Sequence, residues 1–273
     1  MRIINQKLQL IIGNSRNAYD FSELSYSLSV SYKAGEPGTC SGSVYLMSSD
    51  KRQTLVNAKD AACVIRAGYD GFKGEVFKGV RKNAGITEIN DPGKPGISLN
   101  LITSPRILTT TNAKSNGGQT VYSFVKRFCS DNGYQLAVFE GDKRATIGRS
   151  FSVAGNFYKI LGSMAVLADC MVVFSGFEVK FLSFAKRANT VVEISSRSNS
   201  ILKTGQNYDE EKGITYFVET ILLYNIRVGS YVSVKTYDRE SKKERRQTMR
   251  VSEVTHELNS DAMFKTRMSG YYV

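Results

Sequence analysis

The residue types that most often carry catalysis are scarce in this sequence. The chain of 273 residues contains one histidine, His256, and no tryptophan. A nucleophilic or acid–base role for His256 would require a nucleophile and an orienting acid nearby in space. A triad is possible in principle, with Glu253 or Glu257 as the acid. We favour the simpler interpretation, in which His256 is an ordinary residue near the end of a β-strand.

The acidic residues cluster at one place only. Asp209, Glu210 and Glu211 are consecutive and are followed by Lys212–Gly213, which is typical of a turn. Two carboxylates that cleave a glycosidic bond must be held near one another by defined positions of a scaffold. No second acid in the sequence stands out as their partner. We therefore expect a solvated loop here.

Neither a metal site nor a phosphate-binding loop is indicated. The glycine-rich stretch 68–74 lacks the G-x-x-x-x-G-K-[S/T] pattern and lies between two expected strands, so it does not open a helix. With one histidine and no C-x-x-C pair, the chain cannot assemble a zinc site of standard spacing. We expect no cofactor, and we expect four reduced, buried thiols, at Cys40, Cys63, Cys129 and Cys170.

The composition indicates a globular chain with an anionic partner. Hydrophobic residues make up 41% and charged residues 23% of the chain, and the net charge is +12. Such an excess favours nucleic acid, an acidic protein or an acidic membrane surface as partner. Only Tyr237 lies close to the charged loop 238–246 for base stacking. This loop is either a solvated hairpin loop or a docking surface, whose candidate residues are Arg239, Lys242, Lys243, Arg245 and Arg246.

The two ends of the chain have the pattern of β-structure. From Glu23 to Tyr32, apolar residues alternate with serines over nine residues, which predicts a strand. Short strands separated by glycine-rich turns favour a barrel or a sandwich. Further strands are expected at 44–47, 62–69, 74–80 and 97–102 and, after the middle of the chain, at 190–194, 215–220, 231–237, 248–256 and 263–269.

The middle of the chain changes its period. Between Gln119 and Asp131, the apolar residues recur at helical spacing, and Gly133 stands where a helix C-terminal cap is expected. A second helix is expected from near Asn156, with strands at 134–139, 171–174 and 177–184. The predicted fold class is therefore α+β and β-rich: two tube-like β-barrel domains, at 1–110 and 187–273, flank a small α/β domain at 111–186.

No segment indicates insertion into a membrane or secretion. No apolar run approaches the length of about 18 residues that a membrane span needs. The start of the sequence, Met1–Asn5, lacks the long apolar core of a signal peptide. We expect a soluble protein, made in the cytoplasm.

Three stretches of the sequence form a recognisable series. They are the hairpin 64–71 with 75–80; the strands and turns at 191–195, 204–205, 212–214 and 222–232; and the closing hairpin 249–258 with 264–266. Together these stretches resemble the baseplate hub proteins of tailed phages, in particular the Mu-like contractile-tail hub group and the related late-control D family. No single motif is specific, but their joint order and spacing are. Tyr224 and Val228 depart from the family pattern, because many relatives have turn prolines there.

The resemblance implies a non-enzymatic assembly protein of the virion tail tip. Hubs of this family are homotrimeric rings in which two barrels per subunit match the sixfold tail tube on one face and the threefold spike on the other. The implied partners are further copies of the chain, the tail spike, and the tail tube and tube-initiator proteins, with tape-measure and baseplate wedge proteins as additional candidates. DNA would pass transiently through the bore, and the basic excess would serve docking to acidic tail proteins.

Three other functions stay open at this stage. The chain could be the hub component of a phage-derived injection machine, such as a tailocin or a secretion spike. The charge of +12 would also suit a basic nucleic-acid-binding β-barrel protein. A cell-wall hydrolase is a further possibility, against which the missing acid pair and the lone histidine argue.

Overall fold

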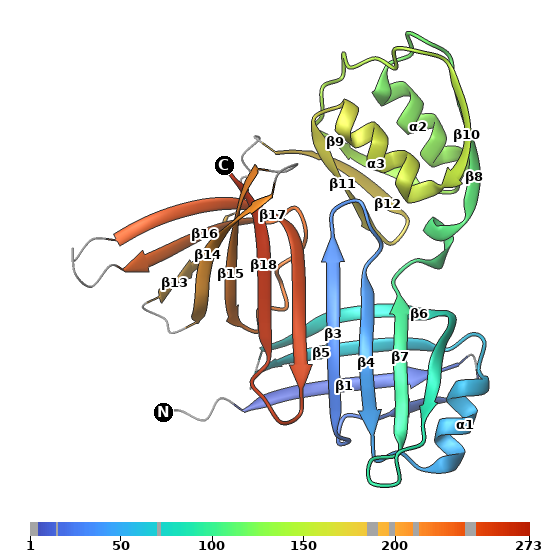
Figure 1. Ribbon diagram of the computed structural model, residues 1–273, viewed down its shortest axis with the longest axis vertical. Coiled ribbons are helices and arrows are strands. Elements are labelled where there is room, and N and C mark those ends of the chain that lie inside the picture. Colours follow the sequence, from blue (N-terminus) through green and yellow to red (C-terminus); the bar gives the residue numbers. More distant parts are fainter. Residues whose placement is uncertain are drawn as a thin grey trace.

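Strands from both ends of the chain join in one large, mostly antiparallel sheet (Figure 1). The computed structural model describes residues 5–14, 16–69, 72–184, 191–196, 200–209, 213–237 and 244–273. The N-terminal elements are β1 (Gln6–Gly13), β2 (Ala18–Asp20), β3 (Tyr26–Lys33), β4 (Thr39–Tyr45), α1 (Ser49–Asn57), β5 (Ala62–Tyr69), β6 (Phe72–Ile89) and β7 (Gly96–Ile102).

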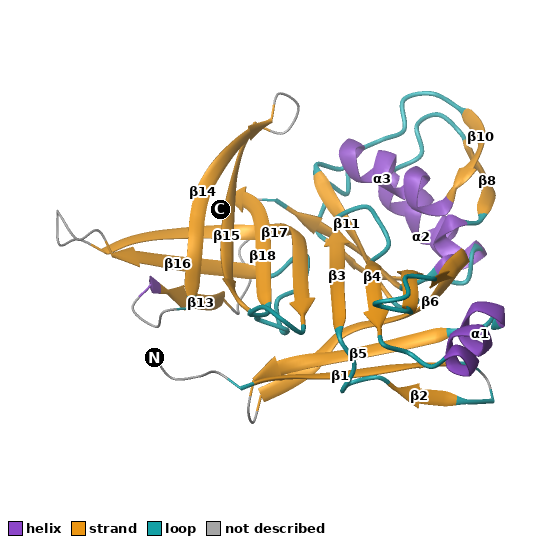
Figure 2. Ribbon diagram, turned by 60° about the horizontal axis from the view of Figure 1, so that its bottom comes forward, coloured by secondary structure: helices purple, strands orange, loops and turns teal. Residues whose placement is uncertain are grey.

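The middle module consists of two helices and two small sheets, while the C-terminal part returns to strands (Figure 2). The middle elements are the 3-10 helix η1 (Pro105–Leu108), β8 (Thr110–Ser115), α2 (Val121–Asp131), β9 (Gln135–Phe139), β10 (Phe151–Asn156), α3 (Phe157–Leu167), β11 (Cys170–Ser175) and β12 (Glu178–Ser183). The C-terminal elements are β13 (Val191–Ser195), β14 (Ile201–Asp209), β15 (Gly213–Ile221), β16 (Tyr231–Tyr237), β17 (Glu244–Asn259) and β18 (Lys265–Tyr272).

The sequence patterns explain the clearest elements. In β3, Tyr26, Leu28 and Val30 are buried and the serines between them lie on the opposite face, because successive side chains of a strand alternate. In α2, the apolar residues at helical spacing are the buried ones. Thr120 caps this helix by accepting a hydrogen bond from the amide of Ser123. These elements confirm the predicted strand and helix.

Other elements have no pattern of apolar residues from which they could be predicted. Helix α1 has a single buried residue, Leu55, so no apolar periodicity revealed it. Strand β14 was missed for a similar reason, since most of its side chains are exposed. The charged loop is shorter than predicted, because Glu244, Arg245 and Arg246 already belong to β17.

The β-rich α+β architecture is confirmed, whereas no sheet formed by the described residues is closed into a barrel. Instead, the same order of strand pairing occurs twice. The N-terminal order is β3-β4-β7-β6-β5-β1, and the C-terminal order is β14-β15-β18-β17-β16-β13. Each repeat contains one long strand with a register shift, β6 and β17. The repeats differ in their last pair, because β1 is antiparallel to β5 while β13 is parallel to β16.

The two repeats meet where β17 pairs with β3. Residues Glu253–Asn259 run antiparallel to Lys33–Ser27. On the buried face of this junction, Val254 and Leu258 point to the same side as the buried residues of β3. Because a strand edge exposes unpaired amide and carbonyl groups, this pairing turns two edges into one continuous sheet.

A buried ion pair fastens the middle module to the C-terminal strands. Arg250 of β17 is only 3% exposed, and its Nη2 lies 3.0 Å from Oε2 of Glu140, which is 18% exposed. The same guanidinium donates to the carbonyl of Ser183 and lies over the ring of Tyr231, 4.8 Å from its centroid. The middle module is also linked to the N-terminal strands, because the Gly35 amide in the β3–β4 turn donates a hydrogen bond of 2.7 Å to the Val172 carbonyl of β11.

Removing the carboxylate should therefore destabilise the fold strongly. Glu140→Gln leaves the Arg250 guanidinium buried without its counter-charge, which costs about 3 kcal/mol or more of unfolding free energy. Urea unfolding followed by circular dichroism measures this loss. The matched control is Glu178→Gln, because Glu178 pairs with Lys180 at 3.2 Å on the surface and exposed pairs contribute about 1 kcal/mol or less. Equal losses in the two variants would refute a structural role for the buried pair.

Candidate assembly interface

The structure describes only some of the predicted docking residues. Arg239, Lys242 and Lys243 lie outside the described residues. Arg245 and Arg246 are exposed at the start of β17. Arg246 binds the carboxylate of Glu193 at 3.0 Å and donates to the hydroxyl of Ser233 at 2.8 Å, so its charge is already paired within the chain. Docking through this loop stays a prediction.

His256 lies in β17, a strand that the sequence predicted. The contacts of its imidazole suit a role in stabilising the fold. Its Nδ1 is 2.9 Å from Oγ1 of Thr266, and that hydroxyl accepts a hydrogen bond from the Leu223 amide at 2.9 Å. The ring is fully buried between the two repeats. Burial, together with the nearby Arg227, lowers the pKa of His256 to about 3. The imidazole is therefore neutral and cut off from solvent, which does not suit acid–base catalysis.

The cysteines and the glycine-rich stretch 68–74 also have structural positions in the fold. All four cysteines are free and buried. Burial raises the pKa of the Cys40, Cys129 and Cys170 thiols to about 12, so they are unreactive at neutral pH. The glycine-rich stretch joins β5 to β6 as a hairpin, with Asp70 and Gly71 outside the described residues.

The structure describes only part of the acidic cluster 209–211. Asp209 is the last residue of β14, whereas Glu210 and Glu211 are outside the described residues. Where the chain is described, no three ligand residues come together as they would for a metal ion. The described helices include none that is both long and apolar enough to cross a membrane.

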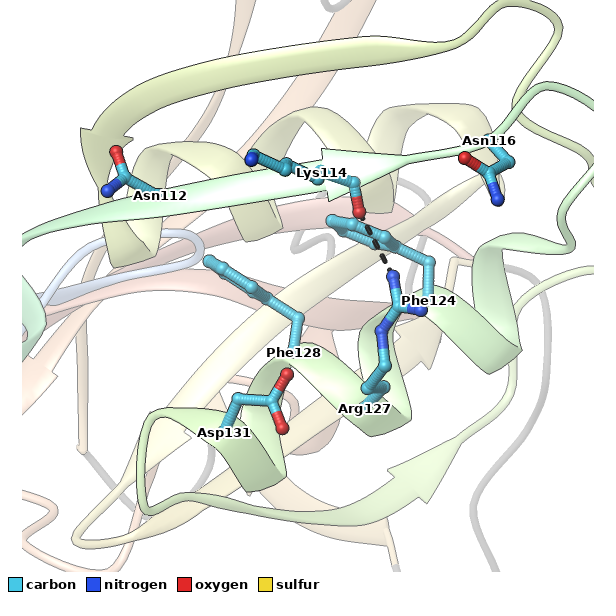
Figure 3. A pocket seen from close by; sticks show the side chains of 7 residues that line it. All are labelled: Asn112, Lys114, Asn116, Phe124, Arg127, Phe128 and Asp131. Atoms are coloured by element: carbon cyan, nitrogen blue, oxygen red, sulfur yellow. Dashed lines mark hydrogen bonds between the residues drawn. The ribbon is translucent and has the colours of Figure 1, made fainter.

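One surface hollow, of about 330 Å³, opens between β8 and α2 (Figure 3). Phe124 and Phe128 point from α2 toward β8, and Arg127 donates to the carbonyl of Lys114 at 3.0 Å. None of its lining residues is a histidine, cysteine, serine or threonine. The lining residues are Asn112, Lys114, Asn116, Phe124, Arg127, Phe128 and Asp131.

Two strand edges of the sheet correspond to the two strands that pair at the junction between the repeats. Strand β14, the counterpart of β3, pairs only with β15. Residues Ile86–Ile89 of β6, the counterpart of the β17 segment that pairs with β3, pair with β7 on one side only. Within the described chain, neither outer edge has a strand partner. The described chain thus contains one paired junction and two unpaired strand segments that correspond to its two sides.

The β14 end of the sheet also exposes large apolar side chains. Tyr208 is 76% exposed and Ile214 is 54% exposed, and the two residues face each other across β14 and β15. Leu202, also on β14, is exposed as well. In contrast, Tyr26, Leu28 and Val30 on the corresponding strand β3 are buried. An unpaired edge with exposed apolar residues is typical of a surface that another strand covers.

The buried imidazole makes the stability of the fold depend on pH. Below pH 6.5 the unfolded chain takes up a proton that the folded chain rejects, because the folded pKa of His256 is about 3. The free energy of unfolding therefore falls as the pH drops from 6.5 toward 3.

Between pH 6.5 and pH 5 this single group accounts for about 2 kcal/mol, since one pKa unit corresponds to about 1.4 kcal/mol. His256→Asn should lose about that much less stability than the parent chain over the same interval. Urea unfolding at both pH values measures the difference. Identical pH dependence in the two proteins would contradict the assignment.

Comparisons with known proteins place the fold. The sequence matches no protein-family model and no curated protein. In structure, the chain is similar to a tail protein from Neisseria meningitidis, with a TM-score of 0.64, 10% identity, and 97% of this chain and 96% of that one covered. It is also similar to the 43 kDa tail protein of prophage MuSo2 from Shewanella oneidensis, with a TM-score of 0.63, 8% identity and coverage of 97% and 98%.

A further similar structure comes from a secretion machine. It is the Escherichia coli c3393 protein, a component of the type VI secretion system with structural similarity to the T4 bacteriophage tail proteins gp27 and gp5. The TM-score is 0.59 at 9% identity, and the match covers all of this chain and 78% of that one. The resemblance to phage tail proteins that the sequence suggested is therefore confirmed at the level of the fold: the chain has the fold of tail proteins along nearly its whole length.

Proposed function

We propose that this chain is a structural hub protein of a phage tail baseplate. In this proposal, three copies form a ring whose six repeats match the sixfold tail tube on one face and the threefold spike on the other. Each repeat, with its share of the sheet, contributes one tube-like barrel domain, at 1–110 and 187–273, and the α/β domain 111–186 lies between them in sequence. The similarity of the whole fold to tail proteins supports this proposal.

The observation that carries the ring is the repeated strand order with its two unpaired edges. Within one chain, β3 pairs with β17. If each repeat contacts its neighbours in the same way, β14 of one copy pairs with Ile86–Ile89 of β6 in the next. A closed ring then leaves no such edge unpaired, which is why closed symmetry is favoured over open association. The number of copies follows from the resemblance to trimeric hubs.

The exposed apolar residues at the β14 edge suit this interface. Burying a large apolar side chain stabilises an assembly by about 1.5–3 kcal/mol. Tyr208 and Ile214 lie side by side at the end of the β14–β15 hairpin and would be covered together. Main-chain hydrogen bonds along β14 would supply the orientation.

The proposed role assigns the protein to the virion tail as a non-enzymatic component. Its proposed partners are further copies of itself, the spike, the tube and the tube-initiator proteins, with tape-measure and wedge proteins as additional neighbours. No cofactor enters the proposal, and DNA would be a transient passenger. The basic excess of the chain would favour docking to acidic neighbours, chiefly by speeding and orienting their encounter.

The alternative is a hub in a phage-derived injection machine. The similarity to the c3393 protein of the type VI secretion system favours it specifically. The two functions share the ring and differ in what is joined to it, so the spike and tube partners found in a pull-down from the native source distinguish them.

Substitutions at the β14 edge should prevent the ring. The double variant Tyr208→Lys/Ile214→Lys places two like charges side by side where a second copy would cover them, and we expect it to be monomeric. The parent chain should form trimers at micromolar concentrations, alone or with its spike. Light scattering coupled to size-exclusion chromatography measures the mass.

The matched control is Val166→Lys, since Val166 is 80% exposed on α3, away from both edges. It should leave the mass unchanged. A parent chain that stays monomeric with and without the spike would refute the ring, and a control that also dissociates would refute the assignment of the interface.

A further inference from the structure

The two repeats can be matched residue by residue, because their strand pairs end at equivalent positions. The pairing of β6 with β7 ends with Ile89 opposite Gly96, and the pairing of β17 with β18 ends with Glu257 opposite Lys265. Gly96 and Lys265 are also the last residues of β7 and β18 to pair with β4 and β15. Gly96 is therefore equivalent to Lys265, and Ile89 is equivalent to Glu257.

A different strand pair gives the same match. The pairing of β3 with β4 begins at Val44, and the pairing of β14 with β15 begins at Thr220. Val44 and Thr220 lie opposite the residues that directly follow Gly96 in β7 and Lys265 in β18. Two independent pairs of strand ends thus fix the same equivalence between the repeats.

The match gives each residue of the β17 segment at the junction a counterpart in β6. Counting back from the ends of the β6–β7 and β17–β18 pairings, Glu88 corresponds to His256 and Ile86 corresponds to Val254. The side chains agree with this assignment in one respect, since Ile86 and Val254 are both buried. They differ in the other, because an acid replaces the neutral histidine.

Strand β14 is matched to β3 in the same way. Gln206 lies opposite the residue four positions before Thr220, and Val30 lies opposite the residue four positions before Val44. Gln206 is therefore the counterpart of Val30, and Tyr208 occupies the next position on the same face of β14.

The strands β14 and β6 lie on opposite sides of the molecule (Figure 1), so they can pair with each other only between copies. We propose that the copies join in the register of the junction within one chain, with Glu88 opposite Gln206 and Ile86 opposite Tyr208, and that Glu88 is the residue that selects this register. The inference rests on the proposed ring, to which it adds the register and its determinant.

Glu88 provides a polar contact that the junction within the chain lacks. One of its carboxylate oxygens, Oε1, accepts a hydrogen bond from Nε of Arg52 at 2.8 Å, and Arg52 is held in turn by the Met47 carbonyl at 2.7 Å. The Glu88 side chain is only 28% exposed, so a strand laid along β6 would remove it from water. Arg52 occupies one oxygen, and the second is the natural acceptor for a donor from the next copy.

Gln206 can supply that donor. It is exposed, and its amide nitrogen donates one hydrogen bond to the Tyr272 hydroxyl. A primary amide has two N–H groups, so one is left for Glu88. Enclosing a carboxylate oxygen without a donor is costly, which makes other registers unfavourable. A slip of one residue turns Gln206 to the opposite face, and a slip of two carries it about 7 Å along the strand.

The second proposed pair explains a difference between two equivalent tyrosines. Tyr32 lies opposite Val254 in the junction within the chain. It is half-buried, and its hydroxyl donates to the Val76 carbonyl at 2.8 Å. Tyr208, two positions after the counterpart of Val30, is 76% exposed. This contrast is expected if Tyr208 is covered only when Ile86 of another copy lies beside it.

Cysteine crosslinking tests the register. In this register Thr87 lies opposite Asn207, and both side chains are exposed. The native cysteines are buried, so Thr87→Cys/Asn207→Cys introduces the only accessible thiols among the described residues. The matched control is Thr87→Cys/Lys203→Cys, because Lys203 is exposed on the same strand but lies about 13 Å further along it.

On mild oxidation, the first variant should form disulfide-linked trimers with a yield at least about tenfold above that of the control, whose thiols are too far apart for a disulfide. Denaturing gels measure the yield, and light scattering measures the mass of each sample before oxidation. Equal crosslinking in the two variants, in samples that are rings by mass, overturns the register and leaves the ring intact. A parent chain that forms no ring, with or without its spike, overturns the proposed function and the register with it.

An exchange of side chains tests the role of Glu88. Gln206→Glu places two carboxylates opposite each other, so the concentration at which half of the chain is trimeric should rise at least about tenfold. Glu88→Gln/Gln206→Glu restores one amide and one carboxylate in exchanged positions, beside the same arginine, and should return to within about threefold of the parent. The matched control is Gln135→Glu, at an exposed position of β9.

Sedimentation equilibrium measures the three variants and the parent, with the spike present if the ring requires it. The control should assemble as the parent does. Unchanged assembly of Gln206→Glu, or a double variant that is as weak as Gln206→Glu alone, overturns the pairing of Glu88 with Gln206. Neither result affects the ring itself, because the parent is measured in the same series.

Discussion

The pairing of β17 with β3 is the contact on which the architecture depends. It joins residues more than two hundred positions apart in the chain and makes one sheet of two repeats. Long-range strand pairing carries a large loop-closure cost, so it forms only when the buried faces on both sides are complementary. Here Val254, His256 and Leu258 continue the apolar face of β3, and β17 also pairs with β16 and β18. A single long strand thus connects the C-terminal core to the N-terminal one.

Other long-range contacts lock the same region. The Arg250–Glu140 pair holds the middle module against β17, and the β3–β4 turn reaches β11 through Gly35. The hydroxyl of Tyr69 accepts a hydrogen bond from the Leu222 amide and donates one to the Phe264 carbonyl. These two bonds link the β5–β6 hairpin to the C-terminal repeat. Because these contacts converge on the junction, the relative orientation of the repeats is fixed within one chain. A rigid orientation is what a symmetric assembly requires, since an error in angle would accumulate around a ring.

The distribution of polarity follows from the same layering. Each repeat has one sheet face that is buried under a second layer and one that is not. The buried faces are apolar and even enclose a neutral histidine, whereas the open face is polar, with serines on β3 and β4 and charged residues such as Glu257 and Lys265 on β17 and β18. The chain combines a net charge of +12 with an open face on which acids and bases lie side by side, as Glu257 and Lys265 do, so net charge alone is a poor guide to which surface meets which partner.

The sequence by itself determined the elements whose side chains are amphipathic: the alternating strand predicted at 23–32, the hairpin of β5 and β6, and helices α2 and α3. It also lacks catalytic and metal-binding patterns. It also carried enough order and spacing to suggest the tail-protein fold. Helix α1 and strand β14 were not predictable, because their exposed side chains lack a periodic apolar pattern. Only the tertiary structure revealed the repeated strand order, the β3–β17 junction and the unpaired edges. The physical reason is that backbone pairing between distant strands uses groups common to every residue, so it leaves no signature in the sequence until the fold brings the strands together.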